Sequence, residues 1–168
     1  MSTLSSSPSL LSLGSPCGEL LKAQGGTIAV TESSTGGLIS AALLAVPGAS
    51  AYYVGGSVVY TLPSRKEILG IRRADVEGLE PLTEAMVLKF AQRARTQLGT
   101  TWAIAELGVA GPTGAPYGHP PGSSVIGIDG PTPATLSIAT GQMDRETNMF
   151  EFTHRALKLL AKTLAGPA

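Results

Sequence analysis

Residues 27–46, TIAVTESSTGGLISAALLAV, show the strand-and-helix pattern on which the predicted fold rests. Residues 27–30 form a short β-branched run that is typical of a buried strand. Residues 38–46 are apolar and rich in alanine, and Pro47-Gly48 follows them directly, which predicts a helix and its end. Three adjacent hydroxyl side chains, Ser33, Ser34 and Thr35, are therefore predicted to lie on a strand-to-helix turn.

This turn has two interpretations. The start of a helix presents unpaired N–H groups and a partial positive charge, which suit a phosphate or the oxyanion of an attacked carbonyl group. Serine and threonine are also the preferred N-cap residues of any helix, so the hydroxyls can serve the backbone alone. Glu32 is open in the same way, because an acid beside a helix N-terminus can orient the turn or bind ribose hydroxyls.

The rest of the chain continues the alternation of strand and helix. Predicted helices cover residues 19–24, 61–70, 83–98 and 145–164. Predicted strands cover residues 56–60, 101–111, 123–129 and 134–140, and the second of these runs into a loop rich in Gly and Pro that begins at Gly111. The last two strands form a hairpin. We therefore predict an α/β fold, a single-domain three-layer α/β/α sandwich with a mixed, mostly parallel sheet. Residues 1–16 are expected to be a flexible Ser-rich tail and residues 17–168 the domain.

Composition restricts the function. The chain has 168 residues, 43% of them hydrophobic, and a formal net charge of zero without a cluster of Lys and Arg, so no nucleic-acid partner is expected. One cysteine excludes an internal disulfide, and neither of the two histidines has a neighbour at metal-ligand spacing, so no metal and no cofactor are expected.

The N-terminal segment gives no sign of export. No Lys or Arg precedes Lys22, which argues against a secretory signal. No apolar run reaches the roughly 18 residues of a membrane span, so no membrane partner is expected. We expect a cytoplasmic protein, with organellar targeting left open.

A serine hydroxyl attacks a carbonyl carbon only when a base takes its proton. A Ser-His-Asp triad would depend on His119, in a loop, or on His154, on the last helix, and is disfavoured. A serine assisted by a lysine and a tyrosine is chemically more natural. Tyr60 ends the second predicted strand, and Arg65 and Lys66 follow it on the next helix. Adjacent parallel strands would bring these residues to the same sheet edge as the hydroxyl turn.

Several motifs together resemble one family, the C-terminal domain of competence-damage-inducible protein A (CinA), which contains nicotinamide-nucleotide amidohydrolases. The family's turn Glu-Ser-Cys-Thr-Gly-Gly is similar to residues 32–37, ESSTGG, with Ser34 in place of the cysteine. The run VPGASAYY, the ILGI of residues 68–71, the GVAGPTG of residues 108–114 and Asp144-Arg145 also follow the family pattern. The resemblance covers roughly residues 18–165.

The resemblance implies hydrolysis of nicotinamide mononucleotide to nicotinate mononucleotide and ammonia. It assigns the nucleophile to Ser33 and its activation to Tyr60 and to a lysine five residues later, where this chain has Arg65. A guanidinium cannot act as the base that a desolvated lysine can, so Lys66 is the alternative base. Lys66 is one residue further along the helix, however, which turns its side chain by about 100° from that of Arg65. Arg65 can instead hold the phosphate or the Tyr60 oxygen.

Substrate binding is expected from three segments. In the turn, N–H groups of Thr35, Gly36 and Gly37 would hold the oxyanion next to Glu32 and Ser34. The loop Gly111, Pro112, Thr113 and Gly114 would shape the pocket, and Arg145 would pair with the phosphate or remain a solvated residue of its helix. Two functions stay open, an amidohydrolase acting on a pyridine nucleotide and a catalytically silent nucleotide-binding homologue. The resemblance also implies a homo-oligomer.

Overall fold

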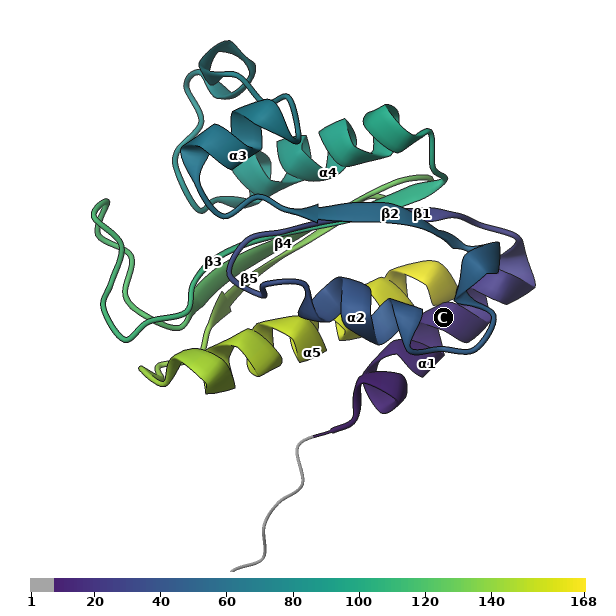
Figure 1. The fold of residues 1–168 in the computed structure, drawn as a ribbon. Helices are drawn as coiled ribbons and strands as arrows, with labels where there is room; N and C mark the ends of the chain where they lie inside the picture. Colours follow the sequence, from purple (N-terminus) through teal and green to yellow (C-terminus); the bar gives the residue numbers. More distant parts are fainter. Residues whose placement is uncertain (1–7) are drawn as a thin grey trace, which may run out of the picture.

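The computed structural model describes residues 8–168, which form a five-stranded sheet with helices on both faces (Figure 1). The helices are α1 (Leu10–Gln24), α2 (Leu38–Leu44), α3 (Leu62–Glu67), α4 (Glu84–Leu98) and α5 (Arg145–Ala165), with the short 3₁₀ helices η1 (Ala49–Ala51) and η2 (Arg73–Val76). The strands are β1 (Ile28–Glu32), β2 (Tyr53–Val58), β3 (Trp102–Val109), β4 (Ser123–Asp129) and β5 (Ala134–Ala139).

The sheet has the strand order β2-β1-β3-β4-β5. Strand β1 pairs in parallel with both β2 and β3, and β4 runs antiparallel to its two neighbours β3 and β5. The predicted mixed, mostly parallel sheet with a terminal hairpin is confirmed. This order places the ends of β1, β2 and β3 side by side, and the candidate site is built there.

The helices form two outer layers, so the predicted three-layer sandwich is also confirmed. Figure 1 shows α1, α2 and α5 on one face of the sheet and α3 and α4 on the other. Alternate residues of a strand point to opposite faces of the sheet. Ile28 and Ile104 therefore pack in the apolar core under α1, α2 and α5, while Ala29 and Ala105 pack in the core under α4. None of the helices within residues 8–168 combines the length and apolarity needed to cross a membrane.

The predicted boundary between tail and domain is wrong for residues 10–16, which are helical. Helix α1 begins at Leu10, where the Ser9 side chain accepts a hydrogen bond from the Ser12 N–H, and it continues through Pro16. Its buried residues Leu13, Cys17 and Leu21 recur every four positions, because the apolar face of the helix packs on the core. Residues 1–7 of the predicted tail lie outside the described part of the chain.

The second strand also lies earlier than predicted. Strand β2 covers Tyr53–Val58 instead of residues 56–60, since its pairing with β1 begins opposite Ile28. Tyr60 therefore lies beyond the strand, between β2 and α3, and its side chain is half exposed. This position leaves Tyr60 free to reach the neighbouring loops.

Candidate active site

The hydroxyl-bearing turn connects β1 with α2, as the sequence predicted, but no hydroxyl caps the helix. The N-cap position of α2 is Gly37, and both Gly36 and Gly37 have positive φ angles, 64° and 102°. Glycine is suited to these positions because it has no Cβ to clash in the left-handed region. Three hydroxyls are thus placed ahead of the helix, where they can meet side chains from other strands.

Glu32 takes over the capping of α2. Its buried carboxylate accepts hydrogen bonds from the N–H groups of Ile39 at 2.8 Å and Ser40 at 3.0 Å. It also accepts one from the Thr35 hydroxyl at 2.7 Å. Of the two roles expected for Glu32, the structure places it in the one that orients the turn, and its carboxylate does not line the pocket described below.

A second acid, Glu106 of β3, lies directly behind the turn and is fully buried. It accepts hydrogen bonds from the N–H groups of Ser33 and Thr35, both at 3.0 Å, and from the hydroxyls of Ser34 and Thr35. Burial raises the pKa of Glu106, and the hydrogen bonds from Ser34, Thr35 and Ser33 oppose that rise in part. Glu106 therefore holds the turn against β3.

Glu106 was missed by the sequence analysis, although a signal was present. It is the one acid inside the apolar run WAIAELGV of a strand buried on both sides. A carboxylate in such a place must be matched by donors from elsewhere in the fold. The Ser124 hydroxyl of β4 donates to Glu106 at 3.2 Å, but the donors of the turn come from residues more than 70 positions earlier in the chain, so that partnership depends on the β1–β3 pairing.

Ser33 differs from its two neighbours. Its hydroxyl makes no hydrogen bond to the described residues, whereas the hydroxyls of Ser34 and Thr35 both contact Glu106. Ser33 is also the residue of the turn that lines a pocket of about 290 Å³. That pocket is completed by Tyr60 and Arg65, by residues 108–111 and 113–115, and by Tyr117 and Arg145. The free hydroxyl thus belongs to the one serine that faces the pocket.

Tyr60 and Arg145 are joined within this pocket. The Nη2 atom of Arg145 donates to the Tyr60 phenol oxygen at 2.8 Å, and its Nη1 atom donates to the Gly111 carbonyl at 2.6 Å. Arg145 is the first residue of α5, so it ties that helix to the loop after β3 and to the segment after β2. The sequence left Arg145 open between a phosphate partner and a solvated residue of its helix, and in the structure two of its N–H groups donate to protein acceptors.

Arg65 and Lys66 have different surroundings on α3. Arg65 lines the Ser33 pocket, its guanidinium carbon lies 5.4 Å from the centre of the Phe90 ring, and its Nε donates to the Val59 carbonyl at 3.4 Å. Burial lowers the pKa of Arg65. Lys66 lies outside the Ser33 pocket, with its ammonium 3.4 Å from the carboxylate of Glu67. The expectation that Lys66 replaces the family lysine does not fit this geometry.

The loop after β3 forms the opposite wall. Gly111, Thr113 and Gly114 line the pocket, whereas Pro112, which follows a cis peptide bond, does not. The residues of the turn other than Ser33, expected to bind substrate, support the pocket from behind. The N–H groups of Thr35 and Gly36 already donate to Glu106 and to the Ser33 carbonyl, so they are not free for an oxyanion. Within residues 8–168, no cluster of three or more His, Cys, Asp or Glu residues could hold a metal ion.

Fold and site together define an α/β/α domain whose strand-to-helix turn presents one free serine to a basic pocket. A sequence model described as the CinA C-terminal domain matches residues 11–164. The chain belongs to the CinA C-terminal domain family, as its motifs predicted.

Individual relatives agree with this assignment. A CinA-like protein from Nostoc sp. is 38% identical over 120 residues, which cover 71% of this chain and 28% of that protein. A CinA-like protein from Chlorobium phaeobacteroides is 34% identical over 160 residues, which cover 92% of this chain and 38% of that protein. The chain thus spans well under half the length of these curated relatives.

Solved structures of the superfamily match the chain over nearly its whole length. A CinA superfamily protein from Klebsiella pneumoniae has a TM-score of 0.86 and 26% identity, covering 94% of this chain and 99% of that one. A CinA superfamily protein from Escherichia coli has a TM-score of 0.83 and 25% identity, covering 95% of this chain and 94% of that one.

Proposed function

We propose that the protein hydrolyses the carboxamide of nicotinamide mononucleotide, with Ser33 as the nucleophile. The observation that carries this proposal is the difference between the three hydroxyls: those of Ser34 and Thr35 donate to Glu106, while Ser33 lines the pocket and its hydroxyl makes no hydrogen bond to residues 8–168. A nucleophile needs an unobstructed hydroxyl, a proton acceptor and a group that orients that acceptor. Ser33, Tyr60 and Arg145 supply these three parts.

Tyr60 is the proton acceptor that the pocket offers. In its phenolate form, held by the Arg145 guanidinium, it takes the Ser33 proton while the serine oxygen bonds to the carboxamide carbon. The carbonyl electrons move onto the oxygen, and when they return, the C–N bond breaks. The leaving nitrogen takes the proton from Tyr60 and departs as ammonia. Water then hydrolyses the ester, which releases nicotinate mononucleotide and restores Ser33.

Charge on the tetrahedral oxygen requires a donor close to Ser33. The N–H of Ser34, the residue after the nucleophile, makes no hydrogen bond within residues 8–168 and is the donor that we propose. A donor in this position is worth about 3 kcal/mol of transition-state stabilisation in serine hydrolases. Glu106 holds the N–H groups of Ser33 and Thr35 on either side, so the backbone that carries this N–H is fixed before the substrate arrives.

Arg65 is better suited to the phosphate than Arg145. Its Nε is hydrogen-bonded, but its two Nη groups make no hydrogen bond to the described residues. A guanidinium with a free face binds phosphate through two parallel hydrogen bonds. The replacement of the family lysine by Arg65 would then change the choice of base and keep the substrate.

The same arginine supports the second candidate function, a nucleotide-binding homologue without catalysis. This alternative follows if the activity depends on an amine at position 65, because a guanidinium does not release its proton near neutral pH.

One experiment separates the two functions. Purified protein is incubated with nicotinamide mononucleotide, ammonia and nicotinate mononucleotide are quantified, and Ser33→Ala is the control. Calorimetry measures nucleotide affinity for both proteins. The hydrolase function predicts release of ammonia that Ser33→Ala abolishes without weakening binding, and binding by both proteins without any ammonia would establish the silent homologue.

A further inference from the structure

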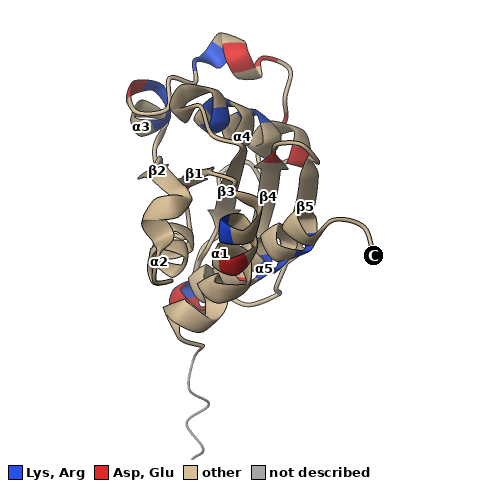
Figure 2. Cartoon of the chain, turned by 90° about the vertical axis from the view of Figure 1, so that its right-hand side faces the viewer, with Lys and Arg blue, Asp and Glu red and all other residues tan. Residues whose placement is uncertain are grey.

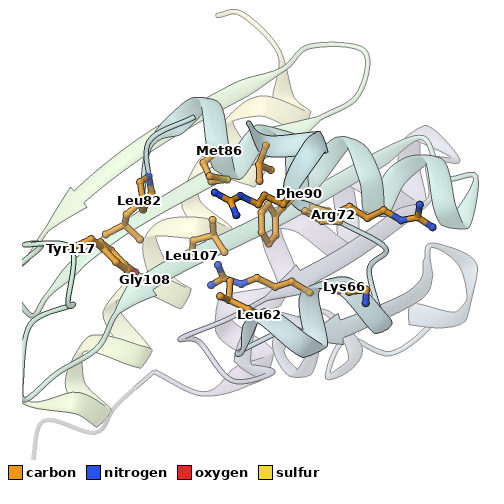
Figure 3. A pocket seen from close by; sticks show the side chains of 14 residues that line it. Leu62, Lys66, Arg72, Leu82, Met86, Phe90, Leu107, Gly108 and Tyr117 are labelled. Atoms are coloured by element: carbon orange, nitrogen blue, oxygen red, sulfur yellow. The ribbon is translucent and has the colours of Figure 1, made fainter. Parts of the chain in front are cut away.

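A second and larger cavity lies beside the Ser33 pocket. It has a volume of about 820 Å³ and is enclosed by α3, the segment that includes η2, α4 and the end of β3. Figure 3 shows the apolar side chains of Leu82, Met86, Phe90 and Leu107 gathered around it. Small-molecule sites span roughly 300–1,000 Å³, so this cavity has room for a ligand of substantial size.

The two cavities adjoin each other. Arg65, Gly108 and Tyr117 line both of them. Gly108 has no room for a side chain, because an added Cβ would clash with the Ser34 hydroxyl and the Glu106 carboxylate behind it. Figure 3 shows Gly108 and Tyr117 at one end of the large cavity and Lys66 and Arg72 at the other. A single ligand can therefore extend from the nucleophile past Arg65 into the apolar space.

The charged side chains that line the two cavities all have the same sign. The charged residues that line them are all basic: Arg65, Lys66, Arg72, Arg73 and Arg145. The chain as a whole has 12 basic and 12 acidic residues, and Figure 2 shows both signs on α3 and on the short helix near it. Within the described residues, neither Arg65 nor Arg73 is in an ion pair with a carboxylate. The cavities are thus suited to an anionic ligand.

We propose that the substrate is a nicotinamide dinucleotide whose second nucleoside occupies the large cavity. This inference rests on the proposed function, since it places the carboxamide at Ser33. A dinucleotide has its negative charge in the diphosphate between two ring systems, which corresponds to a basic residue, Arg65, shared by two cavities. The purine lies against Met86 and Phe90, and its diphosphate contacts the free Nη groups of Arg65.

The test compares the dinucleotide NAD with nicotinamide mononucleotide. Ammonia release gives kcat/KM for each nucleotide. Calorimetry with the Ser33→Ala variant gives the affinity for each nucleotide in the absence of turnover. We expect kcat/KM to be about tenfold or more higher for NAD, because contacts remote from the reacting bond lower its barrier. Met86→Trp, which places a bulky indole where the purine would lie, should remove that advantage and leave the mononucleotide within about twofold.

A second variant avoids the core. Arg73 is exposed on η2, so Arg73→Ala should fold normally and weaken NAD selectively, whereas Lys158→Ala, an exposed cation on α5 across the sheet, should change neither substrate. The two nucleotides could instead have equal affinity and equal kcat/KM, with neither changed by these variants. That result would overturn the dinucleotide inference and leave the amidase function standing. Selective binding of NAD without ammonia release would instead retain the cavity's assignment and refute the amidase.

Discussion

At Ser33, Ser34 and Thr35, three adjacent hydroxyls have different surroundings because only one of them points away from the buried acids. Ser34 and Thr35 contact Glu106, and Thr35 also donates to Glu32. Ser33 is held through its backbone N–H, which leaves its side chain for the pocket. The sequence alone left these hydroxyls divided between capping and chemistry. The structure removes capping from all three, since Gly37 is the N-cap residue.

Tyr60→Phe tests the proton acceptor. The change removes the oxygen that Arg145 contacts and leaves a ring of nearly the same size on a half-exposed residue, so stability should change little. Loss of general-base assistance should lower kcat by about a hundred- to ten-thousand-fold, with KM nearly constant. Tyr117→Phe is the matched control, because Tyr117 lines the same pocket and is equally exposed. Equal losses in both variants would contradict the assignment of Tyr60.

Arg65→Lys tests whether position 65 supplies the base. If Tyr60 accepts the proton and Arg65 holds the phosphate, a lysine at 65 keeps the charge and loses one of two parallel hydrogen bonds, so kcat/KM should fall by about tenfold or less. Steady-state kinetics with nicotinamide mononucleotide measure the change. A rise of about a hundredfold or more would show that the arginine had silenced the site and that Tyr60 is not a sufficient base.

At the scale of elements, two buried carboxylates join β1, α2 and β3 around one turn. Glu32 connects the end of β1 to the first N–H groups of α2, and Glu106 connects the turn to β3. Most strands and helices could be predicted from their apolar periodicity, with α4 and α5 correct to within a residue or two, whereas β2 was placed too late and α1 was found only in part. The role of Glu106 could not, because its donors depend on the lateral order of β1 and β3, which local patterns do not contain.

Glu106→Gln should change the pH dependence of stability. Burial raises the folded-state pKa of Glu106 above its ordinary value, so between the two pKa values the folded protein holds a proton that the unfolded chain has lost. Stability therefore falls as pH rises through that interval and is greatest below it. A glutamine side chain cannot ionise, so this fall should be absent from the variant's urea unfolding curves, measured across the range from acid to mildly alkaline pH.

Glu106→Ala is the contrasting variant. It leaves the N–H groups of Ser33 and Thr35 without an acceptor and should lower the free energy of unfolding by about 2–5 kcal/mol. An alanine variant as stable as the parent would show that the turn does not depend on Glu106. A glutamine variant with the parent's pH profile would show that Glu106 does not titrate as described.

At the scale of the whole molecule, α1 closes the layer that α2 and α5 form. Sequence analysis placed only residues 19–24 in this helix, because the serines and Pro16 before them resemble a tail. The four-residue spacing of Leu13, Cys17 and Leu21 indicates a helix only if the helix is allowed to continue through Pro16. Gly14 is the close contact that this placement requires, since a Cβ there would clash with the Ala42 carbonyl of α2.

Cys17 reports on this packing directly. It is the single cysteine, it is buried, and its thiol donates to the Leu157 carbonyl of α5 at 3.2 Å. Burial raises the pKa of Cys17 to about 12, so at pH 8 only about one thiol in ten thousand is ionised. Ellman's reagent should therefore react with the native protein very slowly and with the urea-unfolded protein completely. Rapid labelling of the native protein would contradict the placement of α1 against α5.

A comparison of two adjacent serines tests whether Ser33 is the nucleophile. Ammonia release from nicotinamide mononucleotide is measured for the parent, Ser33→Ala and Ser34→Ala at equal concentrations of folded protein. We predict that Ser33→Ala reduces kcat by at least about a thousandfold, while Ser34→Ala, which removes one of several donors to Glu106, stays within about tenfold of the parent. Activity that survives in Ser33→Ala and disappears in Ser34→Ala would contradict it.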